Sequence, residues 1–268
     1  MSKQKGDAPQ SNDIAEWIFF GRVVPERVPV YLGPLDLHYE DKQGHVTDTR
    51  VFIHSSQITA RVTTTVGEKN QYTQRNIIES IVRSMVDIAG FKRGIAFDVE
   101  IVSCVLPDKN IYTFGISIPI LYNKNHLADL ALTPEALNTL LSNPYVGLVL
   151  SDFREAMKSP AQTGFFCYRA ADALMQSMKK GDKENDGAAW ERMRSALRID
   201  RAVLDFLKSH ADWARHGKLG GVLDEERAEM FLLTEELIAR FIEYLYDGGK
   251  PLGQDKFPTL QRQSVPTA

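Results

Sequence analysis

The sequence predicts an α+β protein, with a mainly antiparallel β domain that contains one helix followed by an all-helical bundle. Between about residues 14 and 125, short β-branched or aromatic segments are separated by Pro or Gly, which is typical of strands. From about residue 132 onward, apolar residues recur at helical spacing and short loops separate the segments. We therefore expect a flexible N-terminus at 1–13, a β-rich domain at 14–130, a helical bundle at 131–248 and a flexible tail at 249–268.

Five strands are expected early in the chain, in EWIFFGRVV, RVPVYLG, LDLHYE, TRVFIHS and ITARVTTTV. In the last of these, Ile58, Ala60 and Val62 alternate with polar residues, as they do in a half-buried strand. The WIFF cluster, like Trp190, is assigned to the core. Further along the chain, near residues 96–121, AFDVEIVSCVL and IYTFGISIPIL flank the turn sequence PDKN, which predicts an antiparallel hairpin.

One helix interrupts the strands. Thr73 is expected to cap it, and Gly90 is expected to end it. Between them Ile77, Ile81, Met85 and Ile88 recur at helical spacing. Further helices are predicted in the second half, in LTPEALNTLL, PYVGLVLSDFREAMKS, AQTGFFCYRAADALMQSMKK, GAAWERMRSALR, RAVLDFLKSHADWARH and the segment from Asp224 to about Asp247.

Composition restricts the function classes. The net charge of −3 argues against a general polyanion binder, which normally carries a basic excess. The two cysteines, Cys104 and Cys167, lie in apolar segments and are expected to be buried free thiols in a cytoplasmic protein. No secretory signal, membrane span, metal-ligand spacing or dinucleotide fingerprint is evident, so we expect no membrane association, no metal and no cofactor.

The first candidate site lies on the helix expected from Ala161 to Lys179. Most of its circumference is apolar, which predicts a central helix of the bundle. A narrow polar stripe holds Arg169, Asp172 and Gln176, and the first two are three residues apart, so they can pair. The stripe either faces a buried polar network or simply faces water.

The second candidate site is the end of the helix expected from 201 to 216. His210 lies within its apolar arc, either as a core histidine or as a functional group. Asp212, Arg215 and His216 precede a glycine-rich exit. A structural interpretation is also open, because cations at a helix C-terminus complement its dipole and Gly217 can terminate the helix.

The segments FFCYRAADAL, WERM and ADWARHG resemble the HEPN superfamily, and the chain is similar to bacterial proteins that join a β-rich region to a HEPN-like domain. The resemblance covers about residues 145–247. It implies an all-helical, dimeric domain of the kind found in prokaryotic defence or stress systems, many members of which are metal-independent ribonucleases. It would place His216 at the family histidine and Asp172 at the supporting acidic position.

The chain departs from that pattern at the family arginine. Counting back five to seven residues from His216 gives Ala211, His210 and Ser209 instead. We therefore expect a non-canonical HEPN-like protein that acts as a dimerising binding or regulatory module.

A metal-independent ribonuclease is the alternative. It would use His216 as base, Arg215 or Arg169 as the cation and Asp172 for orientation. Ligand contacts are expected at Asp212, His210 and Gln176. The expected partners are a second copy, bound through the helical domain, and an RNA or nucleotide.

Overall fold

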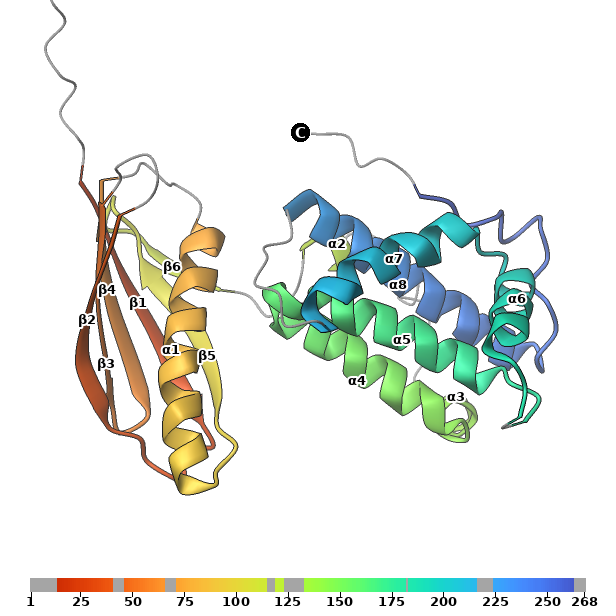
Figure 1. Cartoon of the computed structure of the whole chain (residues 1–268), viewed down its shortest axis with the longest axis horizontal. Helices are drawn as coiled ribbons and strands as arrows, with labels where there is room; N and C mark the ends of the chain where they lie inside the picture. The colour runs from red at the N-terminus through yellow and green to blue at the C-terminus, as the bar shows by residue number, and fades with distance from the viewer. Residues whose placement is uncertain are drawn as a thin grey trace, which may run out of the picture. The chain divides into compact units, whose positions relative to one another are not determined.

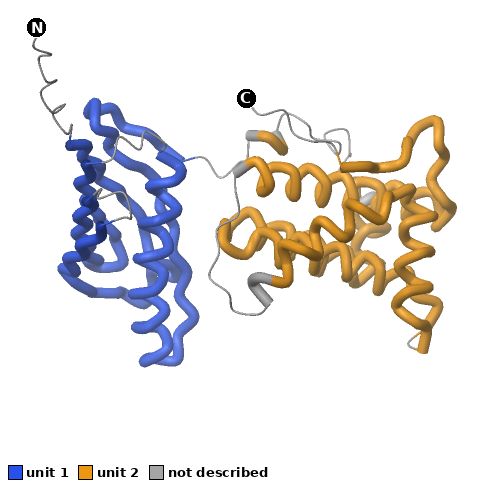
Figure 2. The backbone as a smooth tube through the Cα atoms, turned by 45° about the horizontal axis from the view of Figure 1, so that its top comes forward, with its two compact units in different colours: residues 1–116 blue, residues 117–268 orange. Residues whose placement is uncertain are grey.

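The computed structural model describes residues 14–40, 46–65, 71–114, 119–122, 133–181, 183–215 and 224–262. The chain divides into two compact units, residues 1–116 and 117–268 (Figure 2). The boundary predicted from the sequence is at 130. The short helix α2 (Pro119–Tyr122) contacts α8 (Asp224–Tyr246) and its Leu121 packs against the helical core, so this segment belongs with the helical unit.

The first unit is a six-stranded antiparallel sheet in the order β2-β3-β4-β1-β5-β6. The alternation predicted for ITARVTTTV is confirmed, because Ile58, Ala60 and Val62 are buried on one face. The strands are β1 (Ala15–Val24), β2 (Leu32–Glu40), β3 (Val46–His54), β4 (Gln57–Thr64), β5 (Asp98–Val105) and β6 (Ile111–Thr113).

Helix α1 (Gln71–Arg93) lies across one face of this sheet, against β5 and β1 (Figure 1). It buries Ile78, Val82 and Val86 against the sheet. Ile88, which the sequence analysis placed in a helical repeat with Ile77, is 72% exposed. The helix also begins two residues before Thr73, so Thr73 is not its cap.

Two strand predictions were wrong in part. Residues 27–31 of RVPVYLG form a turn and irregular chain, and only the last two residues of that segment start β2. Strand β6 ends at Thr113, whereas the prediction ran to Leu121, which lies in α2. The hairpin around PDKN is confirmed by the pairing of β5 with β6.

The second unit contains only helices as regular elements in its described residues. Helix α5 packs against α4, α6, α7 and α8, which confirms the predicted central position (Figure 1). The remaining bounds are α3 (Pro134–Leu141), α4 (Pro144–Lys158), α5 (Thr163–Ser177), α6 (Asp186–Leu197), α7 (Arg201–Arg215) and α8 (Asp224–Tyr246).

Helices α5 and α7 meet at a glycine. A Cβ on Gly164 would lie 2.6 Å from the Cβ of His210 and 2.9 Å from its carbonyl carbon and oxygen. Only the absence of a side chain therefore allows the two helices to approach this closely. Cys167, one turn further along α5, is completely buried, as is Cys104 in the sheet unit, and both are free thiols as expected.

The segment expected to be a flexible tail lies against the bundle over residues 249–262. Leu252 is buried and its amide donates to the carbonyl of Ala196. Arg262 donates to both carboxylate oxygens of Glu229, at 2.8 and 2.9 Å, and lies over the ring of Phe206. None of the helices in the described ranges is long and apolar enough to cross a bilayer.

Candidate functional site

The sequence suggested that Arg169 pairs with Asp172, three residues away. In the structure Arg169 instead forms an ion pair with a residue of another helix. Its guanidinium binds the carboxylate of Asp152 on α4, with Nε donating at 2.9 Å. Asp152 is completely buried, whereas the Arg169 side chain is 46% exposed and lies over the rings of Phe165 and Phe166. The pair therefore joins α4 to α5 from the solvent side of the bundle.

The rest of the polar stripe also lies toward solvent. Asp172 and Gln176 are half-buried on α5. Just beyond the helix, Lys179 binds Asp186 at 2.5 Å. That hydrogen bond, followed by the charges of Asp186 and Asp172, raises the pKa of Lys179. The stripe therefore lies at the surface of the bundle, where Arg169 and the neighbouring Lys179 each form an ion pair.

His210 contacts residues of both α7 and α8. Its Nδ1 lies 3.0 Å from the carbonyl oxygen of Phe206 and 3.3 Å from the hydroxyl of Ser209. Its ring packs edge-on against that of Phe206, and its Nε2 lies 3.6 Å from the Glu226 carboxylate on α8. The contact with Glu226 connects α7 to α8.

Two of the predicted site residues cannot be placed as side chains. His216 lies outside the described residues, and Arg215 is the last residue of α7, with no described side chain. Asp212 is half-buried on the same helix. The structure thus brings Arg169 and His210 into interhelical contacts.

A second candidate surface, which the sequence analysis missed, is the sheet face not covered by α1. Because side chains alternate along a strand, this open face carries the residues between the buried ones. It is defined here by Phe20 and Arg22 of β1, Arg50 and Phe52 of β3, and Thr59 and Arg61 of β4.

The two phenylalanines lie in one cross-strand row. Thr59 pairs with Phe52 on one side and with Phe20 on the other. Adjacent strands are about 4.8 Å apart, so the two side chains leave the sheet roughly 10 Å from each other. Phe20 is 38% exposed and Phe52 is 41% exposed. In the described residues of this unit, no helix covers them.

Arginines flank both rings. Residues two apart on a strand share a face, so Arg22 flanks Phe20, Arg50 flanks Phe52 and Arg61 lies beside Thr59. Each guanidinium has a carboxylate partner: Arg22 binds Glu100 at 2.8 Å and Arg61 binds Glu16. The hydrogen bond from Arg61 lowers the pKa of Glu16.

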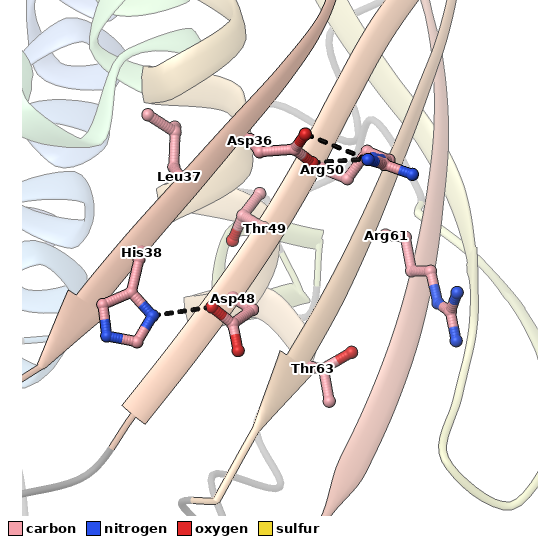
Figure 3. A pocket seen from close by; sticks show the side chains of 8 residues that line it. All are labelled: Asp36, Leu37, His38, Asp48, Thr49, Arg50, Arg61 and Thr63. Atoms are coloured by element: carbon pink, nitrogen blue, oxygen red, sulfur yellow. Dashed lines mark hydrogen bonds and ion pairs between the residues drawn. The ribbon is translucent and has the colours of Figure 1, made fainter.

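A depression of about 430 Å³ continues the open face across β2, β3 and β4. Figure 3 shows Arg50 binding both carboxylate oxygens of Asp36, at 2.6 and 3.0 Å, and His38 contacting Asp48 at 2.7 Å. The hydrogen bond from Arg50 lowers the pKa of Asp36. With Arg61 at its rim, the depression has two guanidinium groups and two carboxylates, so its charge is balanced.

A bulge in β5 lies beside Phe20. The register between β1 and β5 shifts between Phe20, which pairs with Ser103, and Gly21, which pairs with Ile101. A Cβ on Gly21 would lie 2.4 Å from the carbonyl oxygen of Glu100, so glycine is needed there. Bulges redirect side chains and are frequent next to functional sites.

The sequence contained a signal for this face. In WIFF, a strict alternation separates Trp17 and Phe19, which are buried, from Ile18 and Phe20, which face the other side. Assigning the whole cluster to the core was therefore wrong for Phe20. The buried Asp152, in contrast, follows Ser151 in an ordinary amphipathic helix and has no local signature.

Among the residues that the structure describes, no group of three His, Cys, Asp or Glu side chains is placed to hold a metal ion. The open face carries two exposed aromatic rings among guanidinium groups that are each paired with a carboxylate.

The fold and the open face define a two-unit α+β protein with an antiparallel sheet and a helical bundle. Models of domain of unknown function DUF8168 match both units: the N-terminal domain over residues 17–114 and the C-terminal domain over residues 133–246. These matches cover most of the chain, so the protein belongs to the DUF8168 family. No curated protein and no solved structure matches the chain.

Proposed function

We propose that the protein is a binding and regulatory module whose open sheet face binds single-stranded RNA. The observation that carries the proposal is the row Phe52–Thr59–Phe20, in which two exposed rings lie about two strand spacings apart among three arginines. Aromatic side chains on exposed sheets stack with unpaired bases, and guanidinium groups bind phosphates.

The charges of the open face determine how strongly the expected RNA binding depends on salt. Every arginine of the open face is already paired with a carboxylate, and the depression beside it is balanced in charge. A phosphate therefore has to replace a carboxylate partner, which reduces the electrostatic gain. Stacking should supply most of the affinity, and the salt dependence should be weaker than that of a basic RNA-binding groove.

The test is a titration of fluorescently labelled single-stranded RNA, measured by anisotropy, with the wild-type chain and with Phe20→Ala and Phe52→Ala. Stacking contributes about 1–3 kcal/mol per base, so each variant should bind about 5- to 150-fold more weakly. Phe91→Ala is the matched control, because Phe91 is 92% exposed on α1, the helix on the opposite face. Equal affinity in all four proteins would overturn the proposal.

The helical unit is proposed to act as a dimerising scaffold, in a cytoplasmic defence or stress system. Three exposed leucines on α3 and α4 support a contact surface: Leu137, Leu141 and Leu148, which are 40%, 73% and 45% exposed. Leu141→Glu should therefore convert a dimer into a monomer in light scattering. Ile88→Glu on α1 is the control, because Ile88 is equally exposed, at 72%, in the other unit.

A HEPN-like origin of the helical unit, and with it ribonuclease activity at His216, remains a hypothesis. Incubation of labelled RNA with the protein in EDTA, beside His216→Ala, tests it directly. Cleavage by the wild type alone would replace the binding module with an enzyme. Intact RNA in both reactions, together with the affinity measured above, would support binding.

A further inference from the structure

A groove of about 330 Å³ lies between α5, α6 and α7 of the helical unit. Tyr168 lines it from α5, Trp190 and Arg194 line it from α6, and Arg201 and Lys208 line it from α7. The residues contributed by α6 are four apart and those from α7 are seven apart, so each set lies on one face of its helix. The volume is at the lower end of the range of about 300–1,000 Å³ for small-molecule sites.

Two stacked aromatic rings line the groove. The rings of Tyr168 and Trp190 are nearly parallel, with an interplanar angle of 14° and centroids 6.1 Å apart. Both side chains are partly buried and pack against the core of the bundle, which holds them in place. A ring that is already ordered loses little entropy when a planar ligand stacks on it.

The charged residues of the groove have a small positive excess. Arg194 pairs with Glu191 and Arg201 lies 3.3 Å from Asp205, while no ion pair of Lys208 with another described residue is present. Three cations thus face two carboxylates. The Arg201–Asp205 pair is highly exposed, at 76% and 61%, and exposed pairs contribute little to stability. Arg201 can therefore exchange its carboxylate for a phosphate at small cost.

We propose that this groove binds a nucleoside phosphate, with the base stacked on Trp190 and the phosphate held by Arg201 and Lys208. Aromatic rings beside exposed cations are complementary to a ligand that has both a planar ring and an anionic group. The site is separate from the open sheet face, and the inference does not depend on RNA binding there.

The test is isothermal titration of the full chain with AMP, adenosine and inorganic phosphate. AMP is expected to bind at least tenfold more tightly than either adenosine or phosphate, because only AMP engages both parts of the groove. Equal affinity for phosphate and AMP would show that the groove binds only the anionic group, and would contradict a nucleoside-phosphate site. Absence of AMP binding would overturn the proposal outright.

Variants test the phosphate contact and the base contact separately. Arg201→Ala combined with Lys208→Ala should weaken the binding of AMP at least tenfold and leave the binding of adenosine unchanged. Trp190→Leu should weaken the binding of both ligands. Lys250→Ala is the control, since Lys250 is as exposed as Arg201, at 75%, but lies outside the groove. The double variant changes exposed residues, so it tests the proposal even if Trp190→Leu fails to fold. Unchanged AMP affinity in the double variant would contradict the assignment.

The two proposals fail separately. Phe20→Ala and Phe52→Ala should leave AMP affinity unchanged, because both residues lie in the sheet unit. The Arg201 and Lys208 double variant should leave RNA affinity unchanged. Loss of AMP binding in the phenylalanine variants would place the nucleotide on the open face and refute the groove.

Discussion

Gly164→Ala tests the packing that holds the bundle together. Gly164 is the second residue of α5, at its crossing with α7. The added Cβ would lie 2.6 Å from the Cβ of His210 and 2.9 Å from its backbone carbonyl. Carbon atoms in contact are normally about 3.5–4.0 Å apart, so the helices would have to separate by roughly 1 Å.

The cost follows from the identity of these atoms. Two of the three nearest atoms belong to the His210 backbone and cannot move away by a change of rotamer. Overpacking of this kind costs about 1–3 kcal/mol. The higher helix propensity of alanine returns at most about 1 kcal/mol. We expect a net loss of about 2 kcal/mol from the free energy of unfolding.

Urea denaturation followed by circular dichroism at 222 nm measures this loss. With an m-value of about 2 kcal/mol per molar urea, the midpoint of the helical transition should fall by about 1 M. Gly147→Ala is the matched control, since Gly147 is exposed on α4 and a Cβ there would meet nothing within 4 Å. That variant should be slightly more stable than the wild type. An unchanged or higher midpoint for Gly164→Ala would refute the close approach of α5 and α7.

Three further outcomes concern charged and thiol groups. Arg169→Ala leaves the buried Asp152 carboxylate without its cation and should lower the free energy of unfolding by about 2–3 kcal/mol. This loss is smaller than for a fully buried pair because Arg169 is 46% exposed. Adding Asp152→Asn should restore part of that stability in urea denaturation, and a further loss would contradict the pairing. Arg192, followed by the Lys180 amide, lowers the pKa of Glu184 from 4.5 to about 2. This pair therefore stabilises the fold above pH 4.5 and is lost as the pH falls toward 2, so the acid denaturation of Glu184→Gln should lack that component; identical acid curves would argue against it. Burial raises the pKa of Cys167 to about 12 and of Cys104 to about 11, compared with 9 for a free thiol. Stability should fall as the pH rises from 9 toward 12, and Ellman's reagent at pH 8 should label these thiols only after unfolding; rapid labelling of the folded chain would show that they are accessible.

The strand pattern and most helices could be predicted because burial on one face imposes a period of two or 3.6 on the sequence. That rule was sufficient for Ile58, Ala60 and Val62, and for the central helix α5. It was not sufficient for α1, because Ile77 and Ile78 are neighbours and only the structure decides which of them faces the sheet. The structure buries Ile78 and leaves Ile77 49% exposed.

The candidate sites depended on contacts between distant residues, which periodicity does not contain. The partner of Arg169 is 17 positions away in Asp152, and the row of Phe52 and Phe20 requires β3 and β1 to flank β4. Similarly, residues 249–262 looked like a tail because they are polar and rich in Gly and Pro. Their attachment depends on Leu252 and Arg262, each meeting a partner far away in the sequence.

The proposal that the open sheet face binds single-stranded RNA can be tested by photochemical crosslinking. The full chain is crosslinked to single-stranded RNA that contains 5-iodouridine, and the crosslinked peptides are identified by mass spectrometry. Aromatic side chains stacked on a base are the groups expected to crosslink, so we expect adducts at Phe20 and Phe52. Crosslinks confined to the helical unit, with the peptides of β1 and β3 free of adducts, would contradict it.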